Sequence, residues 1–315
     1  MATFNSAGSG NANDDATWTE SGQPASGDHC IIASGHTVTL TADELWGSAR
    51  VIGTIAGGGH TLTLDSSSDD NIFRWDGTIS GNLDITITGG NNKNIKDNSG
   101  TGDIRNLTIN NSGNTINTGD GTSLTISGDL TITAGTLSTT GSNLDLTVAG
   151  TTRVDGTLTC NASTISLGSG KTDGYGLNVA GGGTFTGGSG THTIGSCNLQ
   201  SSTTFTSGTT TIDSAFGGIS LFMDTSISHG NGTVAFTSGA DQKMGETGTD
   251  APTRTFNNLT VNKSGGELTF VDSNPITCAV AGDLTITAGE FDTGPDDVAL
   301  TVTGITTIGD GTGGT

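Results

Sequence analysis

Short runs of alternating apolar and polar residues recur along the chain. Clear examples are residues 37–41 (TVTLT), 61–64 (TLTL), 83–88 (LDITIT) and 130–133 (LTIT). Since successive side chains of a strand point to opposite faces, each run predicts a β-strand with one buried face. Clusters of Gly, Asn, Asp and Ser separate the runs and are typical of turns. The pattern predicts an all-β chain, in which residues 44–50 are the one place where we expect a helical turn.

A long repeat is superimposed on these strands. Residues 106–110 (NLTIN) recur as 258–262 (NLTVN), and residues 128–135 (GDLTITAG) recur unchanged as 282–289. The copies lie 152 and 154 residues apart. Eight identical residues in register, beside a second matching motif, indicate a repeated structural unit rather than chance similarity.

A shorter repeat lies inside the long one. Residues 124–137 match residues 146–158 at an offset of 22 that slips to 21. A third copy follows an inserted loop at about 168–176, and it places Leu177 opposite Leu146 and Phe185 opposite Val154. The same step relates three pairs in the second long repeat: Val280 and Val302, Gly282 and Gly304, Ile286 and Ile308. A period near 22 with two or three short strands is typical of one coil of a β-solenoid.

We therefore predict a parallel β-solenoid (β-helix) with coils of roughly 22 residues and an N-terminal cap. One coil cannot bury its own apolar face, whereas stacked coils bury a continuous core and pair their strands about 4.8 Å apart. Two β-sandwich domains, repeating at the long period, are the alternative, and the short step favours the solenoid.

The repeats also divide the chain into four segments. The predicted segments are an N-terminal cap at 1–45, first coils at 46–105, a first long repeat at 106–257 and an incomplete second one at 258–315. The second repeat stops partway through its pattern without a cap. We expect either a longer parent protein or a partner that covers this end, because open strand edges invite aggregation.

The low hydrophobic content supports a thin core, and the charge argues against nucleic acid and membrane as partners. Hydrophobic residues make up 30% of the chain, below the roughly 45–50% of ordinary domains. The formal charge is −21, and ten Lys and Arg residues form no cluster of the kind that binds nucleic acid. No segment approaches the roughly 18 apolar residues of a membrane span, and the N-terminus lacks the features of a secretory signal. We expect no nucleic-acid partner and no membrane insertion.

Cysteine and histidine residues do not form metal-binding patterns. The cysteines are far apart and form no CxxC, so we expect small buried hydrophobic side chains. The histidines show no HxH or HxxxH spacing, and we expect them at surface or turn positions. Neither a metal nor another cofactor is predicted. The residues are Cys30, Cys160, Cys197 and Cys278, and His29, His36, His60, His192 and His229.

Paired carboxylates are the main candidates for catalysis, since polysaccharide-degrading enzymes use them for acid and base chemistry. The pairs Asp14–Asp15, Asp69–Asp70 and Asp296–Asp297 all lie in stretches rich in Gly, Ser or Asn, where turn chemistry explains them. We expect no enzyme. A lyase-like groove, if the protein had one, would lie at the densest basic group: Arg50, Arg74, Lys93, Lys96 and Arg105.

Exposed aromatic side chains are the usual platforms for sugars, and this chain has only four Trp and Tyr residues. We expect the three Trp residues to pack in the N-terminal part. Tyr175 lies in the inserted loop, in the sequence KTDGYG with Lys171 and Asp173. Lys171, Asp173 and Tyr175 are the predicted contacts with a ligand or partner.

The repeat sequences resemble those of known surface proteins. Residues 255–266 (TFNNLTVNKSGG), followed by 281–286 (AGDLTI), resemble repeats in large bacterial surface proteins and in virion proteins of marine bacteriophages. Residues 16–18 (ATW) and 35–40 (GHTVTL) resemble a segment that often precedes such repeats. The resemblance covers about two-thirds of the chain. Its motifs are structural, and no functional residue is carried over from it.

The resemblance implies a fibre, spike, capsid-decoration or adhesin element. Because no secretory signal is present, we favour a non-enzymatic bacteriophage protein at the virion surface, released by lysis. We expect it to form homo-oligomers and to contact other virion or surface proteins and host surface carbohydrate. The alternatives are a segment of an adhesin on a bacterial cell surface and a polysaccharide-degrading β-helix enzyme.

Overall fold

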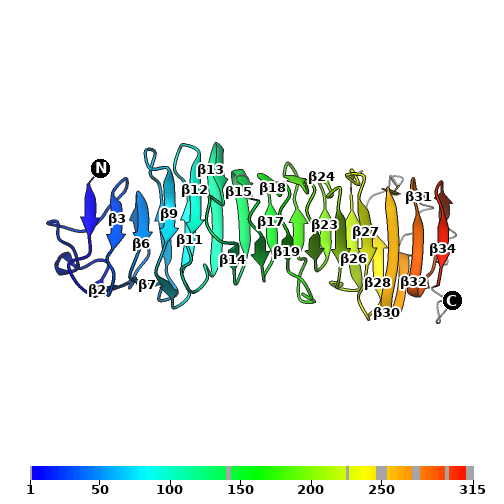
Figure 1. Ribbon diagram of the computed structural model, residues 1–315, viewed down its shortest axis with the longest axis horizontal. Helices are drawn as coiled ribbons and strands as arrows, with labels where there is room; N and C mark the ends of the chain where they lie inside the picture. The colour runs from blue at the N-terminus through cyan, green and yellow to red at the C-terminus, as the bar shows by residue number, and fades with distance from the viewer. Residues whose placement is uncertain are drawn as a thin grey trace. The chain divides into compact units, whose positions relative to one another are not determined.

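The computed structural model contains two compact units, Met1–Val148 and Ala149–Thr315, which we call unit 1 and unit 2 (Figure 1). In each unit, short parallel strands are stacked in coils about 23 residues apart, so each unit is a parallel β-solenoid. This confirms the predicted fold class and excludes the β-sandwich alternative. The structure describes residues 2–139, 143–224, 227–245, 254–271, 277–294 and 298–309.

Unit 1 is built from three parallel ladders. The first contains β1, β3, β6, β9 and β12, the second β5, β8, β11, β13 and β15, and the third β2, β4, β7 and β10. The strands are β1 (Thr3–Asn5), β2 (Gly10–Asn11), β3 (His29–Ile32), β4 (Thr37–Thr39), β5 (Glu44–Trp46), β6 (Ser48–Val51), β7 (Thr54–Ala56), β8 (Thr61–Leu64), β9 (Asn71–Trp75), β10 (Thr78–Ser80), β11 (Asp84–Ile87), β12 (Lys93–Asp97), β13 (Asn106–Asn117), β14 (Leu124–Ile126), β15 (Leu130–Ser138) and β16 (Leu146–Val148).

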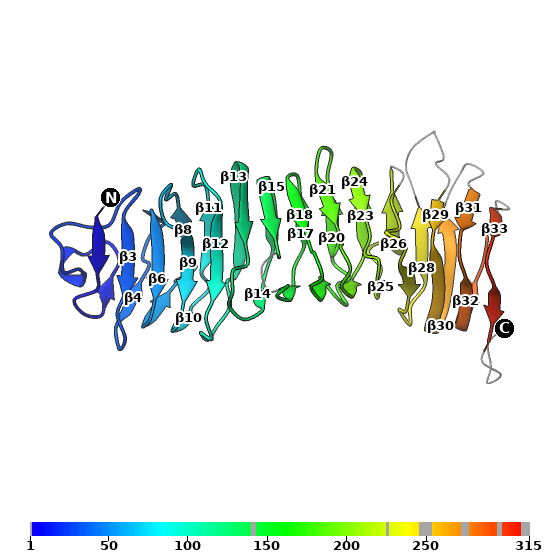
Figure 2. The same ribbon diagram turned by 45° about the horizontal axis from the view of Figure 1, so that its top comes forward.

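Unit 2 repeats this plan with its own ladders. One contains β17, β20, β23, β26 and β28, another β19, β22, β25 and β27, and a third β29, β31 and β33 along one side (Figure 2). The strands are β17 (Thr152–Val154), β18 (Thr157–Thr159), β19 (Ile165–Leu167), β20 (Leu177–Val179), β21 (Thr184–Thr186), β22 (His192–Ile194), β23 (Cys197–Leu199), β24 (Ser202–Thr204), β25 (Thr209–Ile212), β26 (Ile219–Met223), β27 (Thr233–Phe236), β28 (Gln242–Gly245), β29 (Arg254–Phe256), β30 (Asn258–Val271), β31 (Thr277–Val280), β32 (Leu284–Phe291), β33 (Ala299–Val302) and β34 (Thr306–Ile308).

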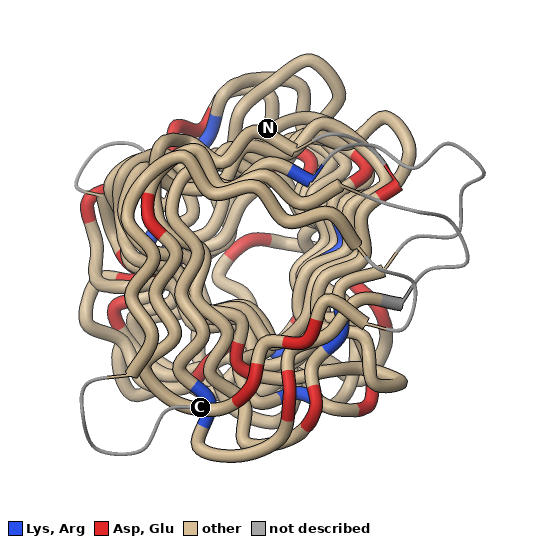
Figure 3. The backbone as a smooth tube through the Cα atoms, turned by 90° about the vertical axis from the view of Figure 1, so that its right-hand side faces the viewer, with Lys and Arg blue, Asp and Glu red and all other residues tan. Residues whose placement is uncertain are grey.

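The core is a set of columns of inward-pointing apolar side chains. In unit 1, Leu62, Ile85, Leu107 and Leu130 pair in register along successive coils, and all four are buried. The Thr residues between them point outward, as the period of two predicts. In Figure 3 the last coils of unit 2 face the viewer, and their chain winds around an interior that such side chains fill.

The expected helical turn at residues 44–50 is wrong. This segment forms β5 and β6, with Gly47 between them. A Cβ atom at Gly47 would lie 2.4 Å from the carbonyl carbon of Gly27 on the preceding coil. The contact requires glycine, and ladder hydrogen bonds hold the chain on both sides extended.

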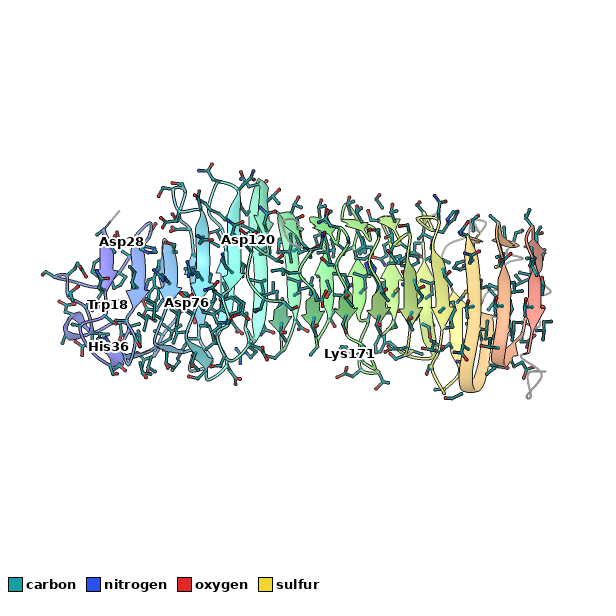
Figure 4. The ribbon with its side chains drawn as sticks, in the orientation of Figure 1. Trp18, Asp28, His36, Asp76, Asp120 and Lys171 are labelled. Atoms are coloured by element: carbon teal, nitrogen blue, oxygen red, sulfur yellow. The ribbon has the colours of Figure 1, made fainter. Side chains whose placement is uncertain are left out.

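The N-terminal segment closes the core of unit 1 with aromatic rings. Trp18 is buried, and its ring lies edge-on to Phe4 at 6.1 Å and to Trp46 at 5.7 Å (Figure 4). The indole Nε1 of Trp18 donates a hydrogen bond to the Ala12 carbonyl at 2.8 Å. A 3₁₀ turn at Asp15–Thr17 leads into Trp18. Stacking of coils already begins here, since β1 pairs with β3.

The short repeat is confirmed where the chain has no insertion. Residues 124–126 pair in register with residues 146–148, and Val280 pairs with Val302. The third copy is wrong in register, because Phe185 pairs with Leu158, and Leu177 pairs with Thr152. The inserted loop lengthens this coil, so the similarity of apolar positions in the sequence no longer identifies which strands pair.

The two long strands, β13 in unit 1 and β30 in unit 2, begin the two copies of the long repeat. The side-chain Oδ1 of Asn106 accepts a hydrogen bond from the Asp129 backbone at 2.8 Å, and Asn258 does the same with Asp283 at 2.9 Å. Both strands shift register after their fourth residue, opposite β15 and β32. The sequence repeat is therefore also a repeat of hydrogen-bonding detail.

Candidate functional site

The predicted contact residues Lys171, Asp173 and Tyr175 lie in the loop between β19 and β20, which projects from the strands of unit 2 (Figure 4). The Lys171 Nζ and Asp173 Oδ1 atoms form an ion pair at 2.5 Å. Tyr175 is half-buried, and its ring lies edge-on to Phe216, with 5.0 Å between the ring centres. Burial, and then the charge of Asp224, raises the pKa of the Tyr175 hydroxyl.

The coil two steps along the stack holds this loop in place. Asp213 accepts hydrogen bonds from the Ser169 hydroxyl and from the Gly170 backbone, the latter at 3.0 Å. The Ser214 hydroxyl donates to the Lys171 carbonyl. The loop can thus present Tyr175 and Asp173 on a fixed backbone, beside the exposed Phe216 of the segment between β25 and β26. Phe216 was missed in the sequence because nothing in its local pattern connects it with Tyr175.

A second candidate is an open pocket of about 320 Å³ on unit 1. It combines the Asp69–Asp70 pair with two members of the basic group, which the sequence analysis treated separately. Stacking brings them together, because β3, β6 and β9 are neighbours in one ladder. The polar lining residues are His29, Arg50, Asp69, Asp70, Asn71 and Arg74.

Two guanidinium groups of this pocket share one carboxylate. Arg50 and Arg74 pair in register on adjacent coils. The Arg50 Nε donates to Asp76 Oδ2 at 3.3 Å, and the Arg74 Nη2 donates to Asp76 Oδ1 at 2.8 Å. Burial raises the pKa of Asp76, but hydrogen bonds from Arg74, Asn98 and Arg50 outweigh it, and the pKa is lowered. Asp76, which is labelled in Figure 4, is thus held as the anion.

Asp69 is held by Ser48 and His29. The Ser48 hydroxyl donates to Asp69 Oδ2, and the His29 Nδ1 lies 2.6 Å from the Ser48 oxygen. Because the single hydroxyl proton goes to Asp69, the His29 Nδ1 must be the donor to Ser48. In a catalytic triad the proton passes from Ser to His. Here the direction is reversed and Ser48 is fully buried, so the contact positions Asp69.

The remaining basic residues have different surroundings. Lys96 continues the Arg50–Arg74 column on the next coil. Lys93 is buried, and burial lowers its pKa although Asp69 and Asp70 act in the opposite direction. Arg105 forms its own ion pair, from Nε to Asp84 Oδ1 at 2.7 Å. The predicted basic group therefore divides into a surface column, a buried lysine and a separate ion pair.

The Asp14–Asp15 pair does not line this pocket. The Asp14 side chain accepts a hydrogen bond from the Ala16 backbone at 3.0 Å and caps the 3₁₀ turn, as turn chemistry predicts. Asp296–Asp297 lies outside the described residues.

All four cysteines are free and buried, as expected, and burial raises the pKa of each thiol. The expectation for histidine is wrong at His192, which is fully buried in β22 between Ile165 and Thr210. Burial lowers its pKa to about 4. His192 points inward because of its place in the alternation of β22, although a histidine side chain is polar.

Within the part of the chain that the structure describes, no group of three or more His, Cys, Asp or Glu residues is arranged to hold a metal ion. The same residues contain no apolar helix of membrane-spanning length. Comparisons with protein-family models, with curated proteins and with solved structures gave no match.

Proposed function

We propose that this protein is a non-enzymatic structural and adhesive element of a bacteriophage surface, acting as a fibre, spike or capsid decoration. The observation that carries the proposal is that each unit is a parallel β-solenoid, in which hydrogen bonds to another coil hold surface turns such as residues 26–27 and 169–170. Strand pairing along a stack gives stiffness without a large core, because each coil is stabilised by its two neighbours.

An aspartate that holds a Ser–Gly turn of another coil occurs in both units. This supports a role in presenting surface features in fixed positions. In unit 1, Asp65 accepts hydrogen bonds from the Ser26 hydroxyl at 2.5 Å and from the Gly27 backbone at 2.9 Å. In unit 2, Asp213 holds Ser169 and Gly170 in the same way. Two Ser–Gly turns, each tied to an aspartate of another coil, suit a protein that works by shape.

We further propose that the protein is displayed on the virion with copies of itself and other virion proteins. The formal charge of −21 favours solubility and opposes unspecific association. Lys171, Asp173 and Tyr175 are the proposed contact with a partner or host carbohydrate. A bacterial cell-surface adhesin of the same fold is the alternative.

Mass spectrometry of purified particles tests the virion assignment. We expect peptides from this chain in particles banded by density, at a constant ratio to the capsid protein. Recovery of the protein only in the host cell-envelope fraction would instead support the adhesin.

The pocket on unit 1 makes polysaccharide cleavage the competing function, since carboxylates and guanidinium groups meet there. Incubation of the purified protein with host capsular polysaccharide, followed by viscosity, tests it. We expect constant viscosity. A fall that Asp69→Asn abolishes would replace the non-enzymatic proposal with an enzymatic one.

A further inference from the structure

The pocket on unit 1 contains polar groups that the fold does not use. Within the described residues, Arg50 has no hydrogen bond from its Nη atoms, and the side chains of Asp70 and Asn71 have none at all. The Arg74 Nε is buried without a partner. A buried donor without a partner costs free energy unless a ligand or water satisfies it. These groups line one pocket, and so they can meet one ligand.

The guanidinium side of the pocket carries a surplus positive charge. Arg50 and Arg74 share the single carboxylate of Asp76. Lys96 extends the same column, and among the described residues it has no ion pair. Side chains in one column of a ladder repeat about every 4.8 Å. The column is therefore suited to an anionic group, and a guanidinium binds a carboxylate with two parallel hydrogen bonds.

Other residues of the lining offer acceptors. The Asp70 carboxylate is exposed, and Asn71 adds an amide that both donates and accepts. The His29 ring has its Nε2 available for a further hydrogen bond, because Nδ1 is engaged with Ser48. Hydroxyl groups need such acceptors. A ligand that satisfies both the guanidinium groups and these acceptors has one carboxylate and several hydroxyls.

We propose that this pocket binds an acidic sugar residue of a glycan, with its carboxylate on Arg50 and Arg74 and its hydroxyls on Asp70 and Asn71. The volume of about 320 Å³ lies at the small end of ligand pockets, roughly 300–1,000 Å³, and fits one sugar ring of a longer chain. The inference rests on the proposed adhesive function and adds to it a carbohydrate site on unit 1, separate from the contact proposed at Lys171, Asp173 and Tyr175 on unit 2.

The strong negative charge of the whole protein does not prevent this binding. At physiological ionic strength the Debye length is about 8 Å, so most of the acidic residues are screened from the pocket. The short-range contacts then determine binding: Arg50 and Arg74 attract the carboxylate of the sugar, and the Asp70 carboxylate of the lining meets its hydroxyls.

Calorimetry with the full chain tests the proposal at about 0.15 M salt. The probes are hexasaccharides of galacturonic acid and of sialic acid, each compared with its neutral methyl ester. We expect at least one acidic probe to bind roughly tenfold or more tightly than its ester, since a charge-assisted contact contributes about 1.5–3 kcal/mol.

Two variants and a matched control locate the site. Arg50→Gln should weaken binding by roughly tenfold. Arg153→Gln removes a guanidinium paired with Asp155 in unit 2, and it should leave the affinity unchanged. Asp70→Asn should weaken binding a few-fold, because a hydroxyl loses its acceptor. A merely electrostatic patch would bind more tightly after this loss of negative charge.

Equal affinity for acid and ester, equal effects of Arg50→Gln and Arg153→Gln, or tighter binding by Asp70→Asn would each overturn the proposal. Peptides in purified particles without glycan binding would refute the sugar site and leave the virion function. Glycan binding by a protein that is absent from particles would support the sugar site and refute the virion function. Cleavage of a probe would support the sugar site and refute the non-enzymatic function.

Discussion

The long strands β13 and β30 have the same backbone plan and different interiors. Each starts with an asparagine that fixes the next coil, and each faces a glycine with φ of +83°, Gly135 or Gly289. The sixth residue of each strand is buried, but it is Asn111 in β13 and Lys263 in β30. Asn111 donates one hydrogen bond, to the Asn91 carbonyl at 3.2 Å.

Lys263 needs a larger set of partners than Asn111. Its Nζ donates to the carbonyls of Ser238 at 2.9 Å and Ala240 at 2.7 Å, and to Gln242 Oε1 at 3.0 Å. The three oxygens use all three protons of the ammonium group. The comparison teaches that turns and register are strictly repeated, whereas an interior position varies when neighbouring coils supply matching partners.

The largest expected effect comes from the two glycines. A Cβ atom at Gly135 would lie 2.2 Å from the Asn111 carbonyl oxygen, whereas at Gly289 it would meet the Lys263 Cβ at 2.7 Å. Both substitutions also strain a positive φ. We expect Gly135→Ala to lower the free energy of unfolding by about 3–4 kcal/mol and Gly289→Ala by about 2 kcal/mol.

Hydrogen exchange of β15 and β32 measures these losses locally, which suits stacked coils that open in parts. Gly8→Ala is the control, since nothing lies within 4 Å of a Cβ there. Equal losses at the two long strands would show that φ strain alone matters and that the facing backbone does not.

Removing the buried cation tests the interior difference. Lys263→Met leaves three oxygens without their donor, and we expect a loss of about 2–3 kcal/mol. Asn111→Leu removes one hydrogen bond together with an Oδ1 that is buried without a partner. We expect its effect to stay within about 1 kcal/mol. Denaturant unfolding of both variants checks the order, and a larger loss for Asn111→Leu would contradict it.

The same lysine predicts a pH dependence. Burial lowers the pKa of Lys263 to about 8, whereas the unfolded chain keeps an ordinary lysine pKa. Above pH 8 the unfolded state then binds more protons than the folded state, so stability from this group rises with pH. Relative to Lys263→Met, the wild type should gain about 1.5 kcal/mol between pH 8 and 9.5.

Taking the difference removes the effect of the four buried cysteines, which are common to both proteins. Their raised pKa values lower stability above their ordinary pKa, because only the unfolded thiols ionise. A wild-type-to-variant difference that is constant across this pH range would show that Lys263 does not titrate there.

The smallest effect is expected at the first residues of the long strands. Asn258→Ala should cost about 1 kcal/mol through the lost bond to the Asp283 backbone. Asn106→Ala should cost slightly more, because its Nδ2 also donates to Asp84 Oδ1 at 3.0 Å. Thermal unfolding resolves this order. Asp84→Ala removes this acceptor and should make the losses at Asn106 and Asn258 equal, and an unchanged difference would show that the bond to Asp84 is not its cause.

Local pattern was enough to predict strands, coil length and the long repeat. Runs such as 61–64 and 130–133 carry a period of two that any half-buried strand must show. The predicted register of the third copy was wrong because of the inserted loop. A loop of nine residues changes which strands pair, although the sequences of the strands still match. The expected contacts Lys171, Asp173 and Tyr175 remain a prediction about binding.

The sequence by itself determined that this chain stacks as a parallel solenoid, because period and turn residues are local properties that every coil repeats. Only the tertiary structure decided which polar residues point inward and which meet at the surface. A shift of one residue turns a strand side chain to the other face, so His192 and Lys263 are buried although their types favour the surface. The pocket joins His29, Arg50 and Arg74 because stacking places residues of three different coils side by side.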